Sequence, residues 1–154
     1  MTLREEKSPL KHGTIPRPLR PRTAAAFASL GFLALSVQAL VLRELLVGWR
    51  GNEMSLGIAL AIWLGLTGLG SLVGARARAA SARVFSGRLA LLGMLAPLTL
   101  LAARFSPALF GIGPGRSAGP WPLVGAAVCS IAPFAVLAGS LFPAAVTLAG
   151  GDRA

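Results

Sequence analysis

The chain has 154 residues, of which 55% are hydrophobic and only 13% are charged, and its formal net charge is +10. Soluble domains carry about 25% charged residues, and a chain this short leaves much of its surface exposed to solvent. The composition therefore excludes an ordinary water-soluble domain and favours a lipid bilayer as the solvent.

The basic residues lie in short segments between apolar runs. A nucleic-acid interface would spread them over one folded face, so we expect no nucleic-acid partner.

The chain has few side chains suited to catalysis or metal binding: one cysteine, Cys129, one histidine, His12, and no tyrosine. We therefore expect no disulfide within the chain, no metal site, no cofactor and no set of catalytic residues.

The first 22 residues are polar, basic and rich in proline, which predicts a flexible or polyproline-like cytoplasmic arm. Residues 23–149 follow as the predicted membrane domain, and 150–154 as a short cytoplasmic end. The first apolar run is too long for a cleaved signal peptide, so we expect it to be retained. The fold class predicted for this chain is an all-α bundle of four transmembrane helices, at about residues 24–47, 54–74, 85–103 and 121–148.

A spanning helix needs roughly 17–25 mostly apolar residues, a length that the first two segments meet clearly. The third is shorter and contains Pro97. The fourth is long and contains Pro133 and Pro143, so it could form one kinked helix or two segments.

The loops predict the orientation. If the amino terminus is cytoplasmic, the outer side holds only Arg43, Arg50, Arg104 and Arg116, and the inner side holds the other eleven of the fifteen Lys and Arg residues. This excess predicts both termini inside and a multi-pass protein of the inner (cytoplasmic) membrane. Trp49 and Trp121 then fall at the outer interface. The inner basic residues are expected to contact anionic lipid, chiefly Arg76, Arg78, Arg83 and Arg88.

A charged hinge joins the first two spans. Gly51, Asn52 and Glu53 have the character of a turn and a helix cap, since Gly permits a tight turn, Asn caps helices and Glu favours a helix start. Arg43 and Glu44 end the first span. Neighbouring helical residues point about 100° apart, so at least one of the two should face the bundle, and the other can reach the headgroups.

Polar and small residues inside the spans are candidates for contacts between helices. Gln38 is the most polar side chain within an apolar run, and it could form an interhelical hydrogen bond or contact a substrate. Glycines of the second and fourth spans fit close helix packing. Because they lie on more than one face, two neighbouring helices are expected at Gly65, Gly68, Gly70, Gly74 and Gly139.

Several of these motifs occur in a known order. Gln38 precedes Arg43 by five residues, the Gly51-Asn52-Glu53 hinge follows, and then come Gly68-Leu69-Gly70-Ser71 and a segment from Pro133 to Pro143. The chain thus resembles the N-terminal membrane segment of the spermidine synthase-like (polyamine aminopropyltransferase-like) multi-spanning membrane proteins, over roughly residues 27–148.

Members of that family often continue into a soluble aminopropyltransferase domain, which we do not expect in this chain. The resemblance therefore implies the membrane part without the enzymatic activity. The loop Gly74-Ala-Arg76-Ala-Arg78 also lacks the acid of an Asp-Arg pair that is frequent in the family, which weakens the case for transporter-like gating.

The expected function is a non-catalytic membrane scaffold or subunit that serves a separately encoded soluble partner. Further membrane helices, from another chain or a second copy, would complete it. The alternative is a transporter-like half-bundle for a small solute such as a polyamine, with Gln38, Arg43 and Glu44 near the path. A cationic solute would require more buried acidic groups than the sequence offers.

Overall fold

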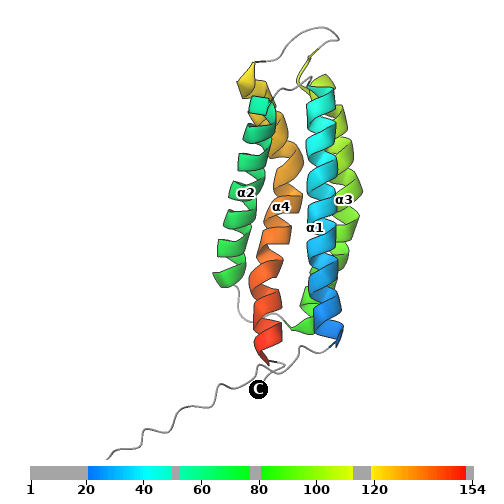
Figure 1. Ribbon diagram of the computed structural model, residues 1–154, viewed down its shortest axis with the longest axis vertical. Coiled ribbons are helices and arrows are strands. Elements are labelled where there is room, and N and C mark those ends of the chain that lie inside the picture. Colours follow the sequence, from blue (N-terminus) through cyan, green and yellow to red (C-terminus); the bar gives the residue numbers. More distant parts are fainter. Residues whose placement is uncertain (1–20, 50–52, 77–80, 113–118, 152–154) are drawn as a thin grey trace, which may run out of the picture.

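The structure, a computed structural model, describes residues 21–49, 53–76, 81–112 and 119–151. Within these residues the chain forms four helices, which Figure 1 shows as a bundle. All four are long and apolar enough to cross a bilayer, so the predicted all-α membrane bundle is confirmed. Their bounds are α1 Pro21–Gly48, α2 Glu53–Arg76, α3 Ala82–Leu109 and α4 Pro120–Gly151.

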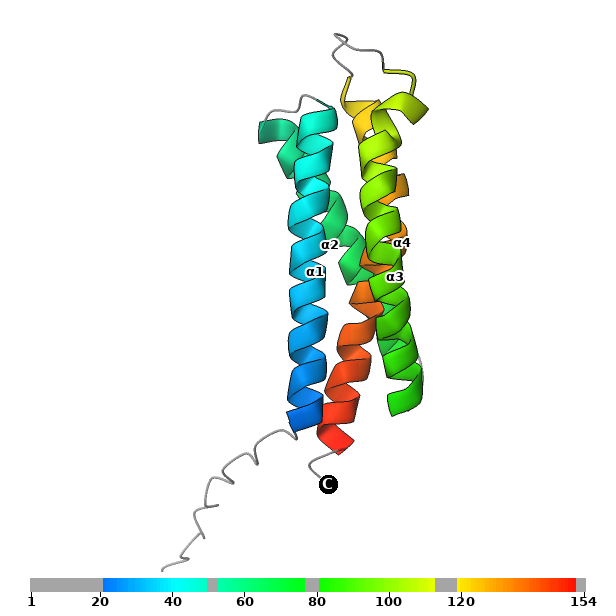
Figure 2. The same ribbon diagram turned by 90° about the vertical axis from the view of Figure 1, so that its right-hand side faces the viewer.

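The helices form two parallel pairs. α1 and α3 run side by side in one direction, and α2 and α4 run together in the other (Figures 1 and 2). The contact between α2 and α4 is the most extensive in the bundle, whereas the sequential pair α1 and α2 meet over a small area. α1 begins and α4 ends at the same end of the bundle (Figure 1), which we call the terminal end; the other is the far end.

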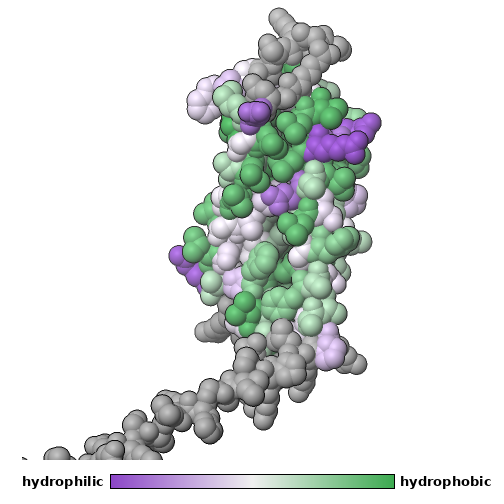
Figure 3. Space-filling view, in the orientation of Figure 1, coloured by the Kyte–Doolittle hydropathy of each residue, from purple (hydrophilic) through white to green (hydrophobic). Residues whose placement is uncertain are grey.

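The centre of the bundle is α4, which contacts all three other helices. In its most apolar stretch 56% of the residues are buried, against 17% in each of the other helices. A bilayer permits this asymmetry, because apolar side chains that face lipid need no cover. Apolar residues dominate the face seen in Figure 3. The centre is closed by side chains that are essentially inaccessible: Val41, Leu92, Ile131, Phe134 and Leu141.

The prolines within α3 and α4 do not end these helices. α3 continues through Pro97 and Pro107 to Leu109, beyond the expected end near residue 103. α4 passes Pro133 and Pro143 as a single helix. Neighbouring helices and hydroxyl side chains can supply the hydrogen bonds that proline removes, so a membrane helix tolerates such residues.

Candidate functional site

The first candidate site is the seam between α2 and α4, where the two backbones touch. A Cβ added at Gly70 would lie 2.8 Å from the Cα of Val136, and one added at Gly74 would lie 2.7 Å from the Cα of Ser140. From the other side, a Cβ on Gly139 would collide with the Thr67 carbonyl group. Lipid supplies no hydrophobic force between helices, so this close approach is what associates them. We call these three glycines and their partners the α2–α4 contact.

Side chains beside this contact complete the packing. The buried rings of Trp63 and Phe134 lie with their centroids 5.8 Å apart. The hydroxyl of Thr67 donates to the Trp63 carbonyl at 2.8 Å, and that of Ser140 donates to the Leu137 carbonyl at 2.8 Å. Both hydroxyls therefore satisfy their donors within their own helix and leave the seam to shape complementarity.

The remaining predicted packing glycines lie elsewhere on α2. Gly65 and Gly68 are exposed, and nothing lies within 4 Å of a Cβ built on either. The structure therefore places Gly70 and Gly74 against α4 and leaves Gly65 and Gly68 on the outward face. The second neighbour expected for that face is not part of the described bundle.

A second candidate site joins the far ends of α1 and α3. The indole N–H of Trp49 donates to the Ser106 hydroxyl at 2.9 Å, and this hydroxyl donates onward to the Ala103 carbonyl at 2.7 Å. The proline at position 107 explains the second bond. Pro107 has no N–H, so the carbonyl four residues earlier, that of Ala103, loses its helical partner. Ser106 replaces that donor, and all its bonds are buried.

Aromatic and proline rings pack around this hydrogen-bonded pair. The Phe110 ring meets Trp49 edge-on, at 6.1 Å between centroids and an interplanar angle of 60°. A Cβ on Gly48 would lie 3.1 Å from the Pro107 ring, and one on Gly125 of α4 would lie 3.2 Å from the Phe110 ring. At both positions a residue larger than glycine would require the neighbouring ring to shift slightly. Trp49 is thus buried against α3 at the far end of the bundle, and its place at the outer membrane interface stays a prediction.

An ion pair lies one turn away from Trp49. A carboxylate oxygen of Glu44 is 3.9 Å from a guanidinium nitrogen of Arg104, with 31% and 68% of the respective side chains exposed. Arg43, the neighbour of Glu44, is exposed. We refer to Glu44, Trp49, Arg104, Ser106 and Phe110 as the α1–α3 cluster.

Gln38 belongs to neither region. Its side chain is half-buried, and in the described part of the chain it makes no hydrogen bond. It precedes Glu44 by six residues, which places the two about 120° apart around α1 and about 9 Å apart along it. The structure therefore does not gather Gln38, Arg43 and Glu44 into one site.

Of the predicted hinge between the first two spans, Glu53 begins α2. Gly51 and Asn52 lie outside the described residues.

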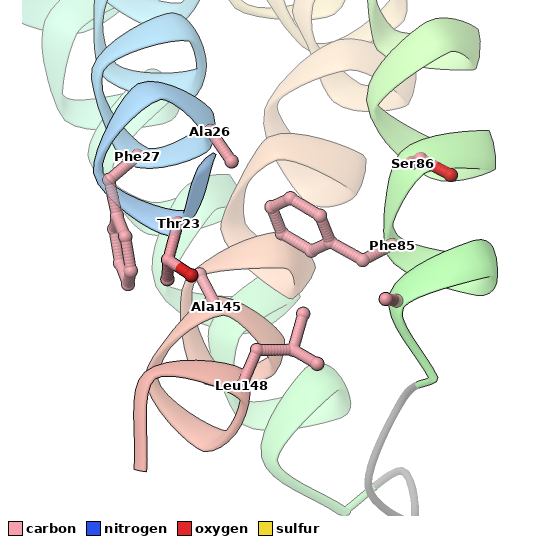
Figure 4. A pocket seen from close by; sticks show the side chains of 8 residues that line it. Thr23, Ala26, Phe27, Phe85, Ser86, Ala145 and Leu148 are labelled. Atoms are coloured by element: carbon pink, nitrogen blue, oxygen red, sulfur yellow. The ribbon is translucent and has the colours of Figure 1, made fainter. Parts of the chain in front are cut away.

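The third candidate site is a cavity of about 320 Å³ at the terminal end, between α1, α3 and α4 (Figure 4). Its walls are mostly methyl groups and aromatic rings, with two hydroxyl-bearing residues. No sequence motif pointed to it, because its walls come from three separate helices. The lining residues are Thr23, Ala26, Phe27, Ala82, Phe85, Ser86, Ala145 and Leu148.

The described residues include no group of three or more His, Cys, Asp or Glu side chains that could hold a metal ion. Cys129 is exposed on α4.

Comparisons of the chain with protein-family models, with curated proteins and with solved structures find no match.

Proposed function

We propose that the chain is a non-catalytic membrane scaffold, related to the membrane part of spermidine synthase-like proteins. The observation that supports this role is the filled centre of the bundle. Phe134, Ile131 and Leu141 of α4 belong to one buried cluster with Val41 of α1 and Leu92 of α3, and none of these side chains is appreciably accessible. Such a core leaves no room for a hydrated solute, whereas a rigid anchor requires this kind of packing.

The outward face of α2 supports a role in assembly. Gly57, Gly65 and Gly68 lie on it with open space beside each, and Ala61 is exposed among them. Small residues at such spacing allow a further helix to approach closely. In this proposal that helix comes from another chain or from a second copy, and the assembly carries a separately encoded soluble partner.

The charge distribution supports a cytoplasmic terminal end in the inner membrane. Arg76 ends α2, and Arg83 and Arg88 lie in the first two turns of α3, all toward the terminal end. Arg43 and Arg104 lie toward the far end. Together with the basic arm of the sequence, this is the asymmetry that directs the richer side to the cytoplasm.

The scaffold role is tested with the full chain in proteoliposomes. Dyes on Cys129 would report self-association by energy transfer, which we expect to fall when Gly65→Leu and Gly68→Leu are combined. The matched control, Leu64→Ala and Leu69→Ala, changes exposed residues of the same helix without adding bulk beside the glycines. The tagged chain can also be purified from its native membranes. Co-purification of a soluble methyltransferase-like protein would identify the separately encoded soluble partner.

Transport of a small solute such as a polyamine is the second candidate. The observation that favours it is the Gln38 amide, which makes no hydrogen bond to the described residues, because polar groups inside a membrane usually find partners. We expect proteoliposomes with the full chain to take up no more labelled spermidine than protein-free ones. Uptake above that level, abolished by Gln38→Ala or Glu44→Gln, would replace the scaffold with the transporter.

A further inference from the structure

We propose that the cavity at the terminal end binds one acyl chain of an anionic phospholipid, with the headgroup held over the first turn of α3. The ligand class is set by the apolar walls and by the arginines at the start of α3. This site does not depend on the scaffold role, because its evidence comes from a different part of the bundle.

The walls suit a hydrocarbon chain. Phe27 of α1, Phe85 of α3 and Leu148 of α4 lie around the space, as Figure 4 shows. Ala26 and Ala145 create the room, because a larger residue at either position would project into it. A volume of about 320 Å³ lies at the lower end of the roughly 300–1,000 Å³ of small-molecule pockets. The cavity can therefore hold part of an acyl chain, but it is too small for a whole lipid.

Water is a poor occupant of this space. The space is partly open and mostly apolar, and a water held in it needs two to four polar partners. The Ser86 hydroxyl at the rim already donates to the Arg83 carbonyl, at 3.0 Å. The surrounding leaflet, by contrast, supplies hydrocarbon at high concentration directly beside the three helices.

Two arginines of α3 follow the lining residue Ala82 closely in the sequence, although neither of them lines the cavity. Arg83 is exposed in the first turn of α3, adjacent to the lining residue Ala82, and Arg88 is half-buried one turn further on. Cα–Cβ bonds tilt toward the start of a helix, so the Arg83 side chain is directed toward the terminal end of the bundle. Neither α1 nor α3 has an acidic residue in its first turn to offset this charge. An anionic headgroup complements these arginines, and a zwitterionic one does so less well.

The headgroup preference can be measured by native mass spectrometry of the full chain in detergent with added phosphatidylglycerol or phosphatidylcholine. We expect one phosphatidylglycerol to be retained, with at least about tenfold preference. Arg83→Gln should weaken its retention about fivefold. The matched control is Arg76→Gln, which removes an exposed arginine at the same end from a helix that does not line the cavity. Equal losses in both variants, or equal retention of the two lipids, would overturn the proposal.

The chain-binding half is tested separately by a phosphatidylglycerol with a diazirine on its acyl chain. Photolysis should label the peptides that contain Phe27 and Phe85. Ala82→Leu narrows the cavity from an exposed position and should reduce this labelling several-fold, whereas Ala90→Leu, also exposed on α3, should not. Labelling confined to outward residues such as Leu98 and Val73, or unaffected by Ala82→Leu, would show that the acyl chain lies on the surface and refute the site.

Discussion

The α2–α4 contact and the α1–α3 cluster hold helix pairs together in different ways. In the α2–α4 contact, glycines bring two backbones together along the seam, and the nearby hydroxyls bond within their own helices. In the α1–α3 cluster, the helices meet at one end through an indole–hydroxyl hydrogen bond, an aromatic pair and an ion pair. The α2–α4 contact depends on glycine, which has no side chain, whereas the α1–α3 cluster depends on particular polar and aromatic side chains.

The comparison shows which changes each pair should tolerate. A backbone seam fails when any atom is added, since two helices cannot move apart locally without losing contact along their length. A side-chain cluster fails when a donor or acceptor is removed, and the cost depends on how deeply the orphaned group is buried. Substitutions of matched size can therefore separate the two mechanisms.

The largest effect is expected for Gly70→Ala. The new methyl group would overlap the backbone of Val136, which cannot rotate away as a side chain could. We expect the free energy of unfolding to fall by about 3 kcal/mol, the upper range for overpacking. The measurement is an SDS titration in mixed micelles, followed by tryptophan fluorescence.

The matched control for that change is Gly68→Ala, two residues earlier on the same helix. Its methyl group meets open space, and alanine favours a helix over glycine by up to about 1 kcal/mol. Stability should therefore stay constant or rise slightly. If both variants lose the same free energy, the α2–α4 contact does not stabilise the bundle in the way described.

A smaller loss, about 2 kcal/mol, is expected for Ser106→Ala. This change orphans both the Trp49 indole N–H and the Ala103 carbonyl, each buried beside Pro107. Ser106→Thr keeps a hydroxyl and should recover much of the stability in the same titration. Ser86→Ala is the control, because Ser86 donates to a carbonyl three residues earlier in the same way but is exposed. A similar loss at Ser86 would contradict the role of burial and of the proline.

The smallest effect is expected for Glu44→Gln. At 3.9 Å, with most of the Arg104 side chain exposed, the ion pair should contribute no more than about 0.5 kcal/mol. Unfolding of the wild type and the variant should differ less as salt is added, because salt screens exposed charges. A loss above about 2 kcal/mol would show that Glu44 has a partner beyond Arg104.

The sequence predicts the bundle well because lipid makes length and hydropathy nearly sufficient to define a spanning helix. It fails at the end of α3. Arg104 looks like the end of a span, yet the helix continues to Leu109. The Ser106-Pro107 pair was the available signal, since a serine before a proline can supply the hydrogen bond that the proline removes.

Pairing of the helices was less predictable than their existence. Sequence spacing shows that Gly68 and Gly70 lie on different faces, but it does not show which face meets another helix of the same chain. Likewise, Glu44 and Arg43 are equal candidates to face inward until Arg104 is placed beside one of them. The cavity could not be predicted, because its walls come from three helices that are distant in the sequence.

The parallel pairing of α2 with α4 has a consequence for biogenesis. During synthesis α2 is complete at Arg76, but its closest partner begins only at Pro120. Insertion of α2 must therefore precede its association with α4, and the glycine-bearing surface of α2 stays unpaired with α4 until that helix is inserted. An insertion factor or a chaperone that shields this surface would act in that interval, and a ribosome stalled between the two helices would leave α2 unpaired.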